Sequence, residues 1–202
     1  MSLYRIIIGI IFSLLFSCII IFFIYFYKSE PLLAEPCIQS QIETGDLILS
    51  SGESFKSRIV KVFENKSNNS IDYSHIGVFV RDKDSIYIIH MSVDANCIKK
   101  ENLKQFILNN EVIAYDIYQM KEANAHKNQL KNIIDSIYSL QKPFDNFFDI
   151  NSEDTYYCTE LIYKSFLQAD IKEINKVKYD KYLYPNDIIN SGLFIKQNIN
   201  YK

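Results

Sequence analysis

The sequence predicts an α+β domain, with an antiparallel sheet and packed helices, preceded by one N-terminal transmembrane helix. Three observations support this prediction: an unbroken apolar run near the N-terminus, several short segments rich in β-branched and aromatic residues, and two later segments with apolar residues at helical spacing. Residues 1–28 are expected to form a membrane anchor or signal segment and residues 29–41 a linker. Residues 42–202 then have the ordinary size of one compact domain.

The apolar run covers residues 6–27 without a charged residue and lies between Arg5 and Lys28. About 20 apolar residues are enough to cross a bilayer as a helix, whereas the apolar part of a cleaved signal is usually about 7 to 15 residues long. We therefore expect a retained single-pass anchor, with a cleaved signal and a lipoprotein signal at Cys18 as alternatives. The flanking charges nearly cancel, so the expected extracytoplasmic position of the domain rests on the usual outcome for a lone N-terminal anchor.

Charge and cysteine usage narrow the possible partners and cofactors. The chain has 22 basic and 24 acidic residues and a net charge of −2, so it lacks the basic excess that attracts nucleic acid. We predict no nucleic-acid partner. The cysteines do not have the spacing of a zinc knuckle, and we predict no metal site. Whether Cys37 and Cys97 form a disulfide stays undecided, because sequence alone does not establish connectivity.

The first half of the domain is predicted to contain a turn leading into a strand, then a helix, then a hairpin of two strands. The strands are indicated by clusters of β-branched and aromatic residues, and the helix by its apolar spacing. In chain order these elements are expected at Thr44–Leu49, Ser54–Glu64, Ser74–Arg81 and Ser85–Met91.

The second half is predicted to contain a short helix, one more strand and two longer helices. Pro143 lies just beyond the end of the first long helix, and Asp154 or Thr155 is expected to cap the second. The four elements are expected at Lys100–Asn109, Glu111–Tyr118, Lys121–Leu140 and Tyr156–Ala169.

Two residues with the chemistry of acyl transfer stand in these elements. His75 lies in a predicted strand, and Cys158 in the first turn of the last long helix, where backbone N–H groups and the helix dipole favour a thiolate. An imidazole that accepts the thiol proton turns such a cysteine into a nucleophile. In an antiparallel hairpin, His90 would lie beside His75 at one end of the ladder. The alternative for each residue is simple packing in the core.

Three sequence blocks resemble the permuted papain-like amidases of YiiX/YaeF type, which are relatives of the NlpC-type cell-wall hydrolases. Gly45-Asp46-Leu47-Ile48 resembles the opening motif of that group, Tyr73-Ser74-His75-Ile76-Gly77-Val78 its histidine strand, and Tyr157-Cys158-Thr159-Glu160-Leu161-Ile162 its cysteine helix. Histidine precedes cysteine in that group because the papain-like core is circularly permuted. The resemblance implies a permuted papain-like (NlpC-like) domain that needs no metal or organic cofactor.

The resemblance also implies roles for individual residues. Cys158 would be the nucleophile and His75 its base, and a third polar residue on the next strand would orient the imidazole. His90 occupies that place, where relatives often have Glu and the lecithin retinol acyltransferase-like branch has His. From the mechanism itself, the backbone N–H of Cys158 is the natural oxyanion donor. Tyr73 is a candidate for a second donor, and the alternative is that its ring simply packs.

We therefore expect a membrane-anchored cysteine hydrolase that cleaves an amide bond by acyl-enzyme chemistry, for instance in cell-wall peptides. Its partners would be a peptide or acyl substrate, from peptidoglycan or lipid, and the membrane. Two alternatives remain. One is a lipid acyltransferase or thioesterase of the lecithin retinol acyltransferase-like type, and the other is a non-catalytic binding module on the same scaffold.

Overall fold

The computed structural model describes residues 16–17, 41–52, 73–121, 123–179 and 181–197. The chain divides into two compact units, Met1–Leu32 and Leu33–Lys202, and the fold below is that of the second. The predicted membrane run and the predicted helix Ser54–Glu64 lie outside the described residues, apart from residues 16–17 of the run. Among the described residues, no helix is both long and apolar enough to cross a membrane.

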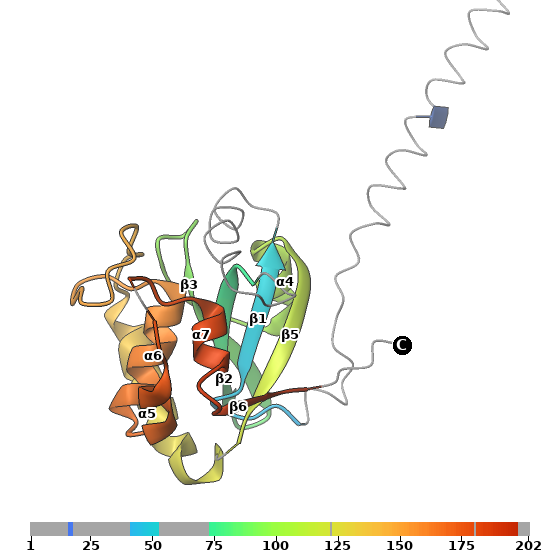
Figure 1. Cartoon of the computed structure of the whole chain (residues 1–202). Helices are drawn as coiled ribbons and strands as arrows, with labels where there is room; N and C mark the ends of the chain where they lie inside the picture. The colour runs from blue at the N-terminus through green and yellow to red at the C-terminus, as the bar shows by residue number, and fades with distance from the viewer. Residues whose placement is uncertain (1–15, 18–40, 53–72, 122, 180, 198–202) are drawn as a thin grey trace, which may run out of the picture. The chain divides into compact units, whose positions relative to one another are not determined.

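The centre of the domain is a six-stranded antiparallel sheet with the strand order β4-β3-β2-β1-β5-β6 (Figure 1). Strands β1 to β4 are neighbours in the order in which they occur along the chain. Strand β5 pairs with the other side of β1, and β6 pairs with β5. This topology places β4 at one edge and β2 and β3 next to it. The strands are β1 (Leu47–Gly52), β2 (His75–Asp82), β3 (Ser85–Ser92), β4 (Cys97–Glu101), β5 (Val112–Met120) and β6 (Phe194–Lys196).

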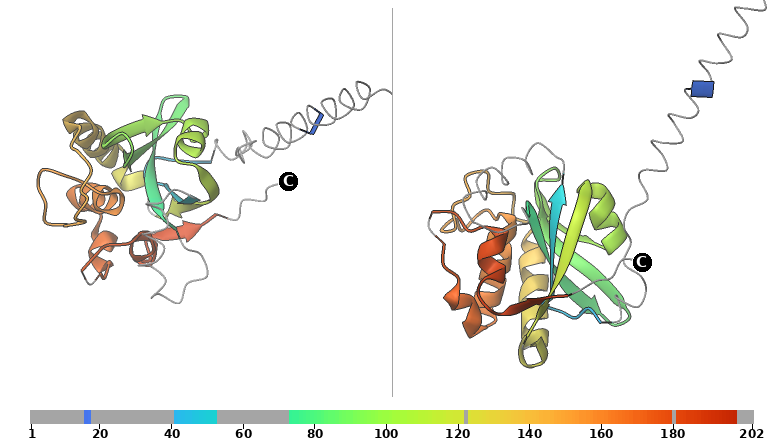
Figure 2. Two further views of the ribbon diagram at one scale, coloured as in Figure 1. Left: turned by 90° about the horizontal axis from the view of Figure 1, so that it is seen from above. Right: turned by 45° about the vertical axis from the view of Figure 1, so that its right-hand side comes forward.

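The two faces of the sheet pack against different helices, because successive side chains of a strand point to opposite faces. One face packs against α5 (Ala123–Leu140) and α6 (Cys158–Gln168), and the other packs against α4 (Leu103–Asn109), as Figure 2 shows. Leu47 and Leu49 thus belong to the α5–α6 side, whereas Ile48 belongs to the α4 side. The C-terminal part adds a 3₁₀ helix, η1 (Lys172–Lys176), and a short helix, α7 (Pro185–Ile189).

The predicted hairpin is confirmed as β2 and β3, but two predicted helix starts are wrong. Lys100 and Glu101 belong to strand β4, and helix α4 starts only at Leu103. The reason is a capping box: the side chain of Asn102 accepts the N–H of Gln105, and the side chain of Gln105 accepts the N–H of Asn102. This reciprocal pair fixes the start of the helix after the strand.

The last long helix, α6, starts two residues later than predicted and is not capped by Asp154 or Thr155. Its N-cap is Tyr157, and the N–H of Tyr157 donates to Oε2 of Glu160 at 3.1 Å. The carboxylate in the first turn therefore satisfies a backbone donor that the predicted cap was expected to serve. Cys158 becomes the first residue of the helix.

The Gly45-Asp46 motif ties the start of β1 to the end of β5. The two carboxylate oxygens of buried Asp46 accept the N–H groups of Glu43 and Met120, each at 2.9 Å. Gly45 has a φ of 98°, and an added Cβ there would lie 2.8 Å from Cε of Met120. Burial raises the pKa of Asp46 from 3.8 to about 6, although both backbone hydrogen bonds lower it.

Candidate active site

The two histidines of the hairpin form a direct hydrogen bond. His75 is the first residue of β2, and its Nε2 lies 3.0 Å from Nδ1 of His90 in β3. Their rings meet edge to face with centroids 5.1 Å apart, and the ring of Phe106 from α4 stacks on His75. The predicted proximity of His75 and His90 is confirmed, and both rings lie on the α4 side of the sheet.

A glycine beside His75 makes this close approach possible. A Cβ on Gly77 would lie 2.6 Å from Cγ2 of Ile88 and 3.3 Å from Cβ of His90. Side chains from β3 therefore occupy the space that any larger residue would need. The glycine of the His-Ile-Gly block has a packing role that supports the histidine pair.

A third polar side chain, Glu101, continues the chain of hydrogen bonds beyond His90. Its Oε2 lies 3.0 Å from Nε2 of His90, and both residues are buried. The amide of Asn109 donates to Oε1 at 2.8 Å, and Lys99 lies 3.7 Å from the same oxygen. The sequence analysis missed Glu101, because it placed this residue in a helix. In strand β4, Glu101 and Lys99 instead share a face.

The surroundings of Glu101 keep its carboxylate ionised. Burial alone would raise the pKa of Glu101, but hydrogen bonds from His90 and Asn109 and the nearby charge of Lys99 lower it from 4.5 to about 2. A carboxylate can only accept hydrogen bonds. The buried end of this chain is therefore a fixed negative charge.

His75 at the other end of the chain is held neutral. Burial and the neighbouring His90 lower the pKa of His75 from 6.5 to about 3, and only Glu101 acts in the opposite direction. At neutral pH the imidazole of His75 is uncharged. It has the lone pair that a general base requires.

Cys158 is half-buried at the start of α6, and it packs against the core on the α5–α6 side. Neither Cys97 nor Cys158 is in a disulfide, and Cys37, the partner considered for Cys97, lies outside the described residues. Glu160, one turn into the helix, is buried and pairs with Lys164 at 2.7 Å. The candidate nucleophile is thus the first residue of a helix whose start is capped by its own Glu160.

The segment leading into α6 is anchored at the end of the sheet where the histidines lie. Phe144 forms a bridge with Tyr156, and its N–H donates to Oδ1 of Asn96 at 3.1 Å. Asn96 is in the turn after β3, close to His90 along the chain, and β2 starts at this same end (Figure 1). Cys158 and the histidine pair therefore come to one end of the sheet from different layers.

Comparison with known proteins assigns the chain to a family. The family model described as a permuted papain-like amidase enzyme, YaeF/YiiX, C92 family, matches residues 41–197. The chain belongs to this family of permuted papain-like amidases. Membership makes the protein a hydrolase, and it confirms the α+β permuted papain-like fold expected for the domain.

A solved structure supports the same fold assignment for the amidase. The chain is similar to the crystal structure of the metalloprotein YiiX from Escherichia coli O157:H7, with a TM-score of 0.61 and 18% sequence identity. The similarity covers 80% of this chain and 99% of the YiiX chain. No curated protein matches the sequence. In the residues of the amidase that the structure describes, no group of three or more His, Cys, Asp or Glu side chains is arranged to hold a metal ion.

Tyr73, the predicted second oxyanion donor of the amidase, has its hydroxyl in another interaction. The hydroxyl donates to Oδ2 of Asp116 at 2.6 Å and lies 3.1 Å from the hydroxyl of Tyr118. Burial and the Asp116 carboxylate raise the pKa of Tyr73 far above its ordinary value. Asp116, which the sequence analysis did not single out, also pairs with Lys196 at 2.9 Å. The oxyanion role of Tyr73 stays a prediction, and it would require this proton to turn away from Asp116.

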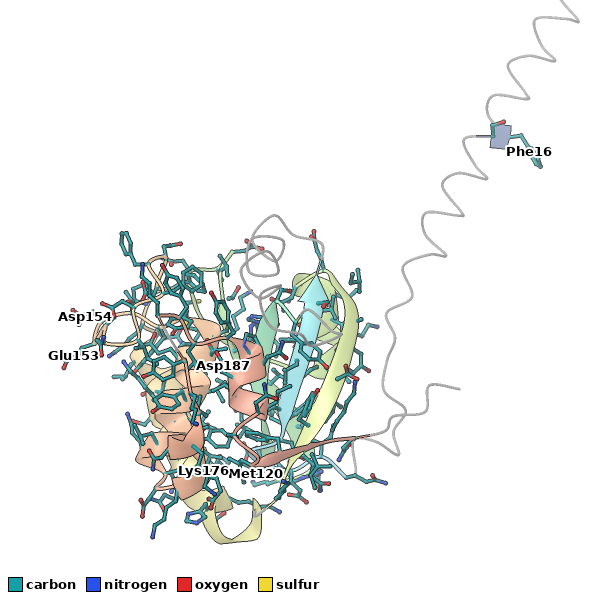
Figure 3. All side chains as sticks on the ribbon, viewed as in Figure 1. Phe16, Met120, Glu153, Asp154, Lys176 and Asp187 are labelled. Carbon is teal, nitrogen blue, oxygen red and sulfur yellow. The ribbon has the colours of Figure 1, made fainter. Side chains whose placement is uncertain are left out.

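A surface cavity of about 550 Å³ lies between the loop before α6 and the outer side of that helix. Its walls include Tyr156, with the ammonium groups of Lys142 and Lys164 4.9 and 5.4 Å from the centre of its ring. Glu153 and Asp154 line it from the loop, where Figure 3 shows them. Neither Cys158 nor the histidine pair lines this cavity, so it is separate from the candidate catalytic residues.

Proposed function

We propose that this amidase uses Cys158 as its nucleophile and His75 as its general base. The observation that carries the proposal is the hydrogen-bonded chain His75–His90–Glu101, in which His90 and Glu101 are buried and His75 is half-buried. The segment leading into α6 is anchored at the end of the sheet where this chain begins. Nε2 of His75 is engaged with His90, so Nδ1 is the ring nitrogen left to serve the thiol. His90 and Glu101 then fix the ring as the third member of a catalytic triad does.

The reaction follows from these assignments. Nδ1 of His75 takes the proton of the Cys158 thiol as sulfur attacks the amide carbonyl, and the backbone N–H of Cys158 donates to the oxyanion. The imidazolium returns the proton to the leaving amine, which departs and leaves a thioester. Water, deprotonated by His75, hydrolyses the thioester and restores the thiol. The low pKa of His75 favours proton transfer during attack over a resting thiolate–imidazolium pair.

The substrate class and location are further parts of the proposal. The apolar run at residues 6–27 supports a membrane-anchored enzyme with an extracytoplasmic domain, for which peptide amides of the cell wall are an accessible substrate. A lipid acyltransferase or thioesterase is the second candidate. The observation that favours it is His90, the residue type found at this position in the lecithin retinol acyltransferase-like branch.

The first test measures the reactivity of Cys158 in the full-length chain. We expect iodoacetamide to modify Cys158 faster than Cys97, and His75→Ala to remove this difference, because the base is lost. Peptide mapping reports each cysteine separately. His126→Ala is the matched control, since His126 lies on α5, away from the site residues, and should leave the rate unchanged. Equal rates at Cys158 and Cys97 in the parent chain would contradict the proposal and favour a non-catalytic binding module.

The second test identifies products from purified peptidoglycan and from phospholipid vesicles. We expect new amine termini from peptidoglycan, and a loss of about 1,000-fold or more in kcat/KM with Cys158→Ala, because the covalent pathway disappears. Release of lyso-lipid without peptide cleavage would instead support the acyltransferase or thioesterase. Cleavage that survives in Cys158→Ala would rule out this nucleophile.

A further inference from the structure

We propose that Glu101 is a positioning residue that sets the tautomer of His75 through His90, and so leaves the basic lone pair of His75 on Nδ1. The inference rests on the proposed function in one respect only, namely that the lone pair accepts the proton of the Cys158 thiol. Glu101 itself is separated from His75 by the whole ring of His90.

The first step is the hydrogen bond between Glu101 and His90. The two atoms, Oε2 and Nε2, are 3.0 Å apart, and both side chains are buried. An ionised carboxylate has no proton to donate, so Nε2 of His90 must carry the proton of this bond. The Glu101 carboxylate therefore determines which nitrogen of His90 is protonated.

The second step is the hydrogen bond between the two histidines. In a neutral imidazole with a proton on Nε2, Nδ1 can only accept. Nδ1 of His90 lies 3.0 Å from Nε2 of His75, so Nε2 of His75 must donate. His75, held neutral by burial, then has its lone pair on Nδ1. The tautomer of the base follows from a carboxylate two hydrogen bonds away.

The environment of Glu101 is built to hold it as an acceptor. Three donors face its two oxygens: Asn109 at 2.8 Å, Asn110 at 3.5 Å and the ammonium of Lys99 at 3.7 Å. Around His90, the other contacts are the ring of Phe106, at 4.9 Å between centroids, and His75 itself. Among the described residues, the polar neighbours named here and His90 all face the carboxylate as donors, which favours its ionised form.

Replacement of the carboxylate by an amide removes this constraint. The amide of Glu101→Gln can present either its oxygen or its NH₂ group to Nε2 of His90. If NH₂ donates, His90 carries its proton on Nδ1, His75 must accept at Nε2, and Nδ1 of His75 becomes protonated. His75 in that tautomer cannot take a proton from a thiol at Nδ1.

The experiment measures the histidine tautomers directly. The full-length chain contains three histidines, so ¹⁵N-histidine labelling gives a simple long-range ¹H–¹⁵N spectrum. We expect His75 and His90 to carry protons on Nε2 in the parent protein at neutral pH. In Glu101→Gln we expect a new population with the proton on Nδ1 of both rings, whereas His126 should not change.

Three further measurements complete the test. Glu101→Gln should lower the alkylation rate of Cys158 by roughly 10- to 100-fold, less than the loss known for a wrong tautomer directly at a triad base. Asn109→Ala is the matched control, because it removes one donor to Glu101 but keeps the carboxylate, and it should preserve both tautomers. Glu101→Asp keeps a carboxylate, which can only accept the proton of Nε2 of His90, so it should keep the parent tautomers.

The parent spectrum alone can overturn the inference, even if Glu101→Gln does not fold. A proton on Nδ1 of His75, or a doubly protonated His90 at neutral pH, would contradict it. Unchanged tautomers in a folded Glu101→Gln would contradict it as well. These outcomes leave the proposed function intact, whereas correct tautomers together with an unreactive Cys158 would remove the proposed function and keep the inference.

Discussion

At the scale of single residues, the site depends on hydrogen bonds between side chains that lie far apart in the sequence. His75 and His90 were predictable as a pair, because a short hairpin brings its two strands together with only one turn to form. Glu101 and Asp116 were not, because their partners His90 and Tyr73 are reached only after β4 and β5 take their places in the sheet. Local sequence patterns carry no signal for such pairings.

A substitution at Gly77 tests how closely β2 and β3 must approach. Gly77→Ala would place a methyl group 2.6 Å from Cγ2 of Ile88, and we expect a loss of about 1–3 kcal/mol in the free energy of unfolding together with a disturbed His75–His90 hydrogen bond. Urea denaturation and the ¹⁵N-histidine spectrum measure the two effects.

Gly192→Ala is a useful control for that substitution. Gly192 has a φ of 83°, so alanine there is strained, but no atom lies within 4 Å of the added methyl group. Its variant should lose stability without a change in the histidine spectrum. If Gly77→Ala left the spectrum of both histidines unaltered, the packing role assigned to this glycine would be wrong.

At the scale of elements, the prediction was best where hydrophobic spacing is long or a turn is short. The long helix α5 and the hairpin of β2 and β3 came close to their expected bounds. The starts of α4 and α6 did not, because they depend on capping side chains: Asn102 and Gln105 for α4, and Glu160 for α6. η1, α7 and β6 have only three to five residues each, too few to show a period, and they depend on packing against the rest of the domain.

The cap of α6 gives a prediction for the helix that carries Cys158. Glu160→Ala removes both the acceptor for the N–H of Tyr157 and the partner of Lys164, and we expect a loss of about 1–2 kcal/mol in the free energy of unfolding. Glu160→Gln keeps an acceptor and should lose less. Urea denaturation compares the three proteins, and equal stability of Glu160→Ala and the parent chain would show that this cap is not needed.

At the scale of the whole molecule, one buried carboxyl links the start of β1 to the end of β5, at the end of the sheet opposite the histidines. Asp46 bonds the N–H groups of Glu43 and Met120, and Figure 3 shows Met120 at that opposite end. Because burial raises the pKa of Asp46 from 3.8 to about 6, the folded state favours its protonated form. Its contribution to stability is full below about pH 3.8 and is lost as the pH rises through about 6.

The pH dependence of unfolding tests this assignment. The difference between 3.8 and about 6 corresponds to about 3 kcal/mol, so the stability of the parent chain relative to Asp46→Asn should fall by up to that amount between pH 4 and pH 7. The Asn variant cannot ionise at this position and serves as the reference. Urea denaturation at several pH values gives both curves, and parallel curves would refute a raised pKa.

Strand β4, which carries Glu101, is the outermost strand on its side of the sheet, and β3 is the one described strand that forms hydrogen bonds with it. Because side chains alternate between the faces of a strand, a slip of one residue along β3 would turn Glu101 to the other face and separate it from His90. Such a protein would keep its helices and its core, but Glu101 would no longer set the tautomer of His75. Loss of activity could therefore arise by strand slippage at the margin of the sheet, without unfolding and without any change at the thiol.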